Sequence, residues 1–255
     1  MFFVPKSGST EQFVSAAVWL AITAIVGTAV VLTAWEYGLH VGVHPRQTAI
    51  AAAELSAAAS VAMLCRNAAP RCSAAVGSSL ILVLGAMAAG ILGSVGQMFP
   101  LPFVDDSLAA ADELLRLQTA DVVRVVIQFR GGPPILAMLY ELATPMLFVS
   151  TLALSCLGRF ERVWELCAAF TFCIFLATLT SVLFPAAGAF EHSGIAAQYG
   201  AHLPGGSGVY HLRMLYSLRS ASELTIDPFA LRGMVTFPSF HCDGVDDGGS
   251  LARRP

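Results

Sequence analysis

The sequence predicts an all-α membrane protein, a polytopic helix bundle with at least five transmembrane helices, and two observations support this fold class. Hydrophobic residues make up 56% of the 255 residues and charged residues only 12%, with a mean hydropathy of +0.71. Soluble domains carry roughly 25% charged residues, so this chain has about half the usual solvating charge. The charges also lie between long apolar runs, which is the pattern that a bilayer imposes.

Five apolar runs have about the 20 residues that a helix needs to cross a hydrocarbon core. They cover roughly residues 13–35, 48–65, 74–98, 134–157 and 163–184. The first follows Lys6 but is longer than the apolar region of a signal peptide, so we expect it to be a retained span. The second is short and contains Glu54, which makes it the weakest of the five.

The short loops predict the orientation of the bundle. Arginines lie between the second and third runs and between the fourth and fifth: Arg66, Arg71, Arg159 and Arg162. Basic loops stay in the cytoplasm, so we expect these loops and the N-terminus to be cytoplasmic in a bacterial inner (plasma) membrane. The hydrophilic stretches 100–133 and 185–240 then share the outer face, where two long loops can build an active site.

Local patterns refine this organisation. Residues 106–118 combine an apolar stripe with acids at the start, which predicts an amphipathic interfacial helix. The RGGPP stretch at 130–134 breaks the chain before the fourth span. Small residues four apart in the third span, Ala86/Gly90 and Ala89/Gly93, suit close helix packing; a span with no special partner remains an equal interpretation.

Several polar residues have two interpretations. Glu54 and Glu141 fall inside spans, where ionisable groups are usually functional, but both could also reach water. His40 and His44 have the spacing of metal ligands on a helix, yet we interpret them as interfacial residues. Histidines in the Gly-rich loop are expected to be solvated: His192, His202 and His211.

The sequence indicates no metal site and no cofactor. The net charge is −3, and the sequence has no stripe of basic residues that would bind nucleic acid. The sequence leaves the oligomeric state open.

The stretch VTFPSFH, residues 235–241, contains a Pro-Ser-x-His unit. A turn there would expose the Ser239 hydroxyl and backbone amides to a phosphate, and His241 would lie close enough to protonate a leaving oxygen. The spacing alone is a weak signal, and its place after five spans on the outer face strengthens it.

The stretch and its context resemble the type 2 phosphatidic acid phosphatase superfamily, and within it the inositol phosphorylceramide synthase-like branch. The resemblance also rests on LPFVDDSL at 101–108, Tyr140, Pro145 and Phe184-Pro185. It implies a six-helix core, an outward phosphate pocket, and phosphoryl transfer from a lipid phosphate through a phosphohistidine. By this resemblance, His241 is the acid and Ser239 contacts phosphate. Arg219 and Arg213 are weaker candidates for holding the phosphate.

The sequence departs from this family's pattern in two places. No Lys-six-residues-Arg-Pro motif is present, and no histidine lies in the polar residues 242–255. We therefore expect three parts: helices at 1–99, an incomplete phosphatase-like domain at 100–241, and an aberrant tail at 242–255. The corresponding hypothesis is a truncated or frameshifted chain with little activity. The alternative is a non-catalytic membrane protein or small transporter, although no internal repeat supports a transporter.

Overall fold

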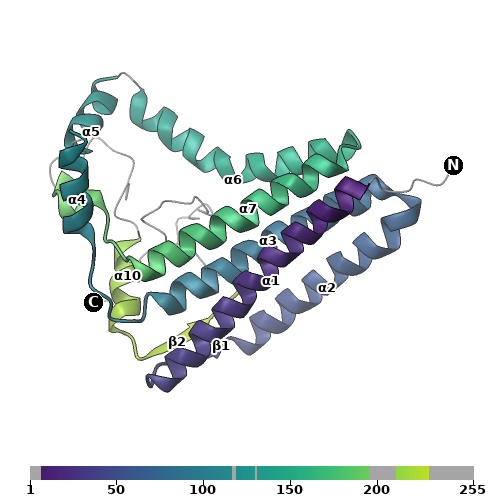
Figure 1. Cartoon of the computed structure of the whole chain (residues 1–255), viewed down its shortest axis with the longest axis horizontal. Coiled ribbons are helices and arrows are strands. Elements are labelled where there is room, and N and C mark those ends of the chain that lie inside the picture. Colours follow the sequence, from purple (N-terminus) through teal and green to yellow (C-terminus); the bar gives the residue numbers. More distant parts are fainter. Residues whose placement is uncertain (1–6, 117–118, 130, 196–210, 230–255) are drawn as a thin grey trace, which may run out of the picture.

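Five long helices form the bundle in the computed structural model, which describes residues 7–116, 119–129, 131–195 and 211–229 (Figure 1). They are α1 (Ser7–Glu36), α2 (Pro45–Ala68), α3 (Pro70–Gly96), α6 (Gly132–Cys156) and α7 (Phe160–Leu183). Each is long and apolar enough to cross a membrane. The predicted all-α bundle with five spans is confirmed.

The helix boundaries follow from local chemistry. Proline lies in the first turn of α2, α3 and α6, where its missing N–H costs nothing because that amide has no partner inside the helix. The second apolar run, the shortest in the sequence, is a full helix of 24 residues that continues to Ala68. The predicted break before the fourth span is present as well, since Gly131 has a φ of +83° at the start of α6, a conformation that glycine adopts freely.

Helix α3 is the centre of the bundle and packs against α1, α2, α6 and α7. Glycines allow α7 to approach it closely: a Cβ at Gly85 would lie 3.1 Å from Thr171 Cγ2, and one at Gly93 would lie 3.4 Å from Thr178 Cγ2. The small residue Gly93 therefore does face a particular partner, helix α7.

Several polar residues inside the bundle form hydrogen bonds within or between helices. The hydroxyl of Thr171 donates to the Cys167 carbonyl at 2.9 Å, within the same helix. Gln97 joins two helices, because its Nε2 donates to the Ser181 carbonyl of α7 at 3.1 Å. Such internal pairing is what a bilayer demands, since lipid offers no partner.

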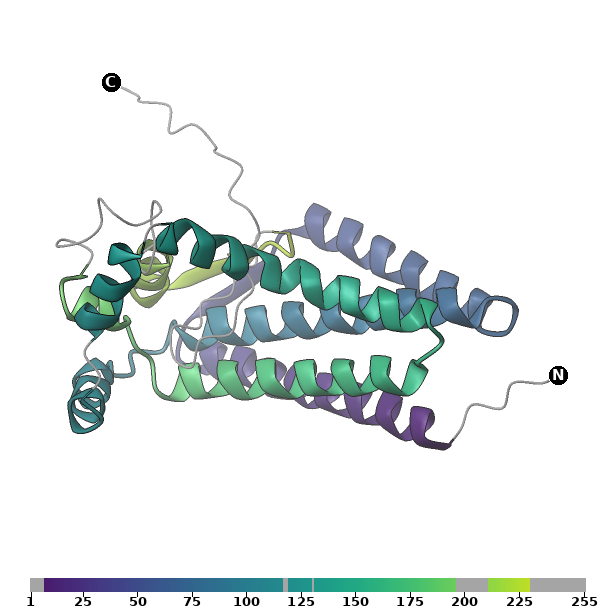
Figure 2. The ribbon, with the colours of Figure 1, turned by 90° about the horizontal axis from the view of Figure 1, so that it is seen from above.

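One end of the bundle gathers the shorter elements (Figures 1 and 2). These are α4 (Asp105–Leu114), α5 (Thr119–Gln128), α8 (Ala189–His192), α10 (Leu212–Ser220), β1 (His40–Val43) and β2 (Glu223–Ile226). The interfacial helix predicted at 106–118 corresponds to α4, whereas α5 and the parallel β1–β2 pair were not predicted. The described parts of the two long hydrophilic stretches thus share one end, as expected. The α2–α3 and α6–α7 turns lie at the other.

Candidate head-group site at one end of the bundle

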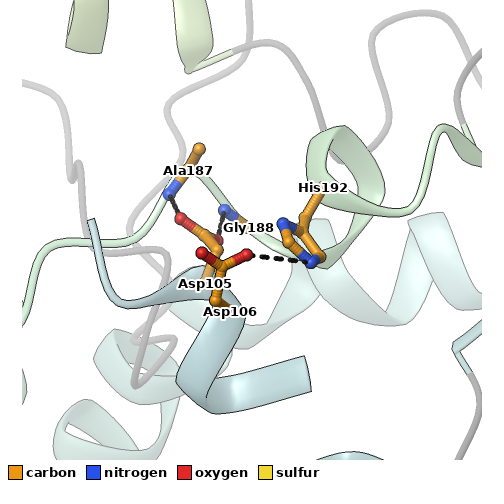
Figure 3. A network of polar contacts seen from close by, with 5 residues as sticks. All are labelled: Asp105, Asp106, Ala187, Gly188 and His192. Atoms are coloured by element: carbon orange, nitrogen blue, oxygen red, sulfur yellow. Dashed lines mark hydrogen bonds and ion pairs between the residues drawn. The ribbon is translucent and has the colours of Figure 1, made fainter. Parts of the chain in front are cut away.

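Asp105, the first residue of α4, holds the chain that follows α7 (Figure 3). Its Oδ2 accepts a hydrogen bond from the Ala187 N–H and its Oδ1 accepts one from the Gly188 N–H, both at 2.9 Å. Hydrogen bonds to a charged acceptor are stronger than neutral ones, and a carboxylate is favoured at a helix N-terminus. Asp105 therefore fixes the position of the loop after α7 against α4.

The neighbouring Asp106 approaches His192, the last residue of the short helix α8 that follows this loop. Its Oδ1 lies 3.8 Å from His192 Nε2, and Figure 3 shows the ring turned towards the carboxylate. Both residues are exposed, so the expected solvation of His192 is confirmed, and the pair contributes little to stability. His211 differs from expectation, because it is half-buried with its Nε2 3.1 Å from the Ala187 oxygen. His202 lies outside the described residues.

Helix α10 docks through an apolar face. Leu212, Leu215 and Leu218 recur every third residue, and all three are buried. Leu212 and Leu215 cluster with Ala187, and Phe103 packs against this cluster. This packing fixes the rotation of α10 and so determines where its arginines lie.

Arg219 lies near the end of α10 with its guanidinium over the Phe103 ring, 4.2 Å from the ring centroid. Its Nη2 donates to the Leu101 carbonyl. Its Nη1 is buried and has no hydrogen-bond partner among the described residues. Burial lowers the pKa of Arg219, but a guanidinium titrates far above neutrality and stays charged. A fixed cation with an unused donor is a suitable ligand for an anion.

A pocket of about 260 Å³ opens beside these residues. It is lined by Phe103, Asp105, Asp106, Ala187, Glu191, His192 and Tyr216. The Phe103 and Tyr216 rings meet edge to face, with centroids 6.2 Å apart, and form an apolar wall. Carboxylates accept hydrogen bonds from hydroxyl groups, so the Asp106 and Glu191 part of the lining suits a polyhydroxylated group. In the described part of the chain, no cluster of three or more acids, histidines or cysteines is arranged to hold a metal ion.

The residues predicted from the sequence are only partly brought together. Arg219 reaches the wall of this site, but Arg213 is exposed on α10; six residues of helix turn it well away from Arg219. Ser239 and His241 lie outside the described residues. The sequence did not predict the hydrogen bonds of Asp105 to the loop after α7 or the approach of Asp106 to His192. The only signal was the Asp-Asp pair opening an amphipathic helix.

The fold and this site define a polytopic membrane protein with a small acidic pocket at one end of its bundle. A model of the PAP2 superfamily matches residues 106–243, more than half of the chain. The chain belongs to the PAP2 superfamily, whose phosphatase-type chemistry acts on lipid phosphates. No curated protein and no solved structure matches it. Helices α1 to α3 precede the matched region.

Proposed function

We propose that this protein is a membrane lipid-phosphate phosphatase or phosphotransferase of the inositol phosphorylceramide synthase-like kind, acting at the outer membrane surface. The observation that carries the proposal is the buried Nη1 of Arg219, which has no hydrogen-bond partner among the residues that the structure describes. A buried donor without a partner costs about 1–3 kcal/mol, and a phosphate oxygen bound to it would remove that cost. The guanidinium geometry also matches a phosphate better than an ammonium does.

The acidic pocket supports the phosphotransferase form of this proposal. Its volume of about 260 Å³ is close to the lower end of the roughly 300–1,000 Å³ that ligand sites span, so it suits a head group and not a whole lipid. Asp106 and Glu191 would accept hydrogen bonds from the hydroxyls of an inositol-like ring, while Arg219 beyond Phe103 holds the phosphate.

The chemistry needs an acid and a nucleophile. By family resemblance, His241 protonates the leaving oxygen and Ser239 contacts the phosphate. For the nucleophile we propose His192, because the Asp106 carboxylate lies beside its Nε2. A proton held on Nε2 leaves the lone pair on Nδ1 free to attack phosphorus.

The test compares Arg219→Ala with its matched control Arg213→Ala, an exposed arginine on the same helix. Purified protein in detergent would be assayed for phosphate release from phosphatidic acid, and for binding of a short-chain phosphatidic acid by calorimetry. Losing a charged hydrogen bond costs about 1.5–3 kcal/mol, so Arg219→Ala should weaken binding at least about 10-fold. Arg219→Lys should recover only part of it, and Arg213→Ala should change it less than about 2-fold. Equal effects of the two alanine variants would contradict the role of Arg219.

A second comparison tests the acidic pocket. Glu191→Gln should weaken binding of phosphatidylinositol and leave binding of phosphatidic acid unchanged, because only the former carries a ring for the pocket. A variant that weakens both lipids equally would argue against a separate site for the ring.

A further inference from the structure

A second cavity lies along the spanning helices, away from the head-group site. Its volume is about 550 Å³, and it is lined mainly by α2 and α3, with Leu152 of α6 and with Pro228 and Phe229. We refer to it as the lateral groove. It exists because α2 and α6 each pack on α3 but do not pack along each other. Small side chains keep it open, among them Ala51, Ala58, Ala75 and Ser79.

The groove lies at the depth of the hydrocarbon. Helix α2 has 24 residues and is about 36 Å long at 1.5 Å per residue, against a core of about 30 Å. Glu54 is nine residues from the start of α2 at Pro45, about 13 Å along the helix. It therefore lies about 10 Å inside the core, so the occupant of the groove comes from the bilayer and not from water.

The size of the groove selects the kind of occupant. A spanning helix about 10 Å wide and about 30 Å long fills on the order of 2,000 Å³, several times the volume of the groove. A helix from a second copy of this chain would not enter it. A hydrocarbon chain is thinner, and the lining beside it is almost entirely apolar.

Among the described residues that line the groove, Glu54 is the ionisable one. Within the described residues no hydrogen bond or ion pair reaches this carboxyl group. An ionisable group at this depth is costly unless it finds a partner. A phospholipid keeps its charged head at the surface, whereas a neutral lipid alcohol has a small head group that can sink below it and donate a hydrogen bond.

We propose that the lateral groove binds a neutral lipid alcohol, with one chain along α3 and its hydroxyl donating to Glu54. Pro228 and Phe229 close the outer end, where the pairing of β2 with β1 places them. Helices α2 and α3 supply most of the groove and lie before the PAP2-matched region. The site is thus separate from the phosphate-binding site proposed above and does not depend on turnover.

The probes are a diacylglycerol, which has a free hydroxyl, and a phosphatidylcholine, which has none, each with a diazirine in one acyl chain. The protein would be reconstituted in phosphatidylcholine vesicles, irradiated, and mapped by mass spectrometry. Diacylglycerol should label the peptides around Ala58 and Ser79 at least 5-fold more than phosphatidylcholine does.

Three variants make the test specific. Ala58→Trp fills the groove and should remove its labelling. Met63→Trp adds the same bulk on α2 at a residue that is 77% exposed and should leave it unchanged. Glu54→Leu should reduce diacylglycerol labelling to the level of phosphatidylcholine. Ser79→Leu replaces Ala58→Trp if that variant does not fold.

Labelling spread evenly over the lipid-facing side chains and unchanged by Ala58→Trp would overturn the proposal. Equal labelling by both probes in the unmodified protein would overturn the role of Glu54. Neither result bears on phosphate release from phosphatidic acid, so this proposal and the proposed function fail separately.

Discussion

The Asp105 carboxylate joins two segments far apart in sequence, because its Oδ1 accepts a hydrogen bond from the Gly188 N–H at 2.9 Å. The bond connects the start of α4 to the loop after α7, across 83 residues. Both the acidic pocket and the loop that carries His192 depend on this join. Asp105 therefore positions the loop after α7, whereas its neighbour Asp106 lines the pocket.

Replacing Asp105 with alanine should loosen this loop while the bundle stays folded. Ala187 and Gly188 would lose the acceptor of their N–H groups, at a cost of about 1–3 kcal/mol for each buried donor. Hydrogen exchange at these two amides should become at least about 10-fold faster, since about 1.4 kcal/mol corresponds to a factor of ten. Mass spectrometry of peptides covering 184–195 would measure it.

Glu113→Gln is the matched control, since it removes an exposed acid from the same helix. It should leave exchange in the loop unchanged. Asp105→Asn keeps one carbonyl oxygen and should give an intermediate rate. Unchanged exchange in Asp105→Ala would show that the loop is held by other contacts.

The bundle could be predicted from the sequence because bilayer thickness and apolar run length determine where spanning helices lie. The head-group site could not, because its contacts join residues that no local pattern relates. The link from Asp105 to Gly188 and the packing of Arg219 on Phe103 depend on how α4, α7 and α10 meet. Arg219 itself was identified through resemblance, but the sequence could not show that its Nη1 is buried without a hydrogen-bond partner in the described part of the chain.

The strand pair was missed for a similar reason. HVGV at 40–43 and ELTI at 223–226 are each only four residues long, and short apolar runs do not distinguish strand from loop. Their pairing connects residues 183 positions apart, from His40 to Glu223. This strand pairing places Pro228 and Phe229 at the lateral groove, and nothing in the sequence around these two residues predicted that position.

Gly96→Ala should destabilise the bundle. A Cβ at Gly96 would lie 2.7 Å from Val182 Cγ1 and would overlap other atoms of the same side chain, so α3 and α7 would have to separate. Overpacking of this kind costs about 1–3 kcal/mol, and the midpoint of thermal unfolding in detergent should fall.

Gly27→Ala is the control, because its Cβ would find only ordinary contacts at 3.9 Å and beyond. It should be neutral or stabilising, since alanine is the better helix former. Equal midpoints for the two variants would contradict close packing at Gly96.

We predict that the end of the bundle with α4, α8 and α10 faces away from the cytoplasm. The prediction rests on the arginines of the α2–α3 and α6–α7 turns at the other end. A membrane-impermeant maleimide should label Glu113→Cys on intact cells, in a background where Cys242 is serine. The native thiols of Cys72 and Cys156 lie at the opposite end and are exposed, so they should react only after permeabilisation. Labelling of Cys72 and Cys156 on intact cells, with Glu113→Cys protected, would invert the topology.

The last prediction concerns His192 as the nucleophile. Attack by Nδ1 on the phosphorus of phosphatidic acid would form an N–P bond and break the P–O bond to the lipid alcohol. The leaving oxygen would take a proton from His241. A phosphohistidine is labile in acid, so rapid quenching with ³²P-labelled phosphatidic acid should give an acid-labile, alkali-stable phosphoprotein.

His192→Ala should abolish this phosphoprotein. Asp106→Asn should form it at least about 10-fold more slowly, because a neutral amide holds the Nε2 proton and stabilises the phosphorylated imidazolium less well than a carboxylate does. The distance of 3.8 Å between His192 Nε2 and Asp106 Oδ1 is too long for a hydrogen bond. We expect this distance to shorten when phosphate binds, as catalytic contacts often do.

His40→Ala is the control, since it removes an exposed histidine at the same end of the bundle and should leave the phosphoprotein intact. A phosphoprotein that persists in His192→Ala would assign the nucleophile to another residue and leave the Asp106–His192 pair a surface contact.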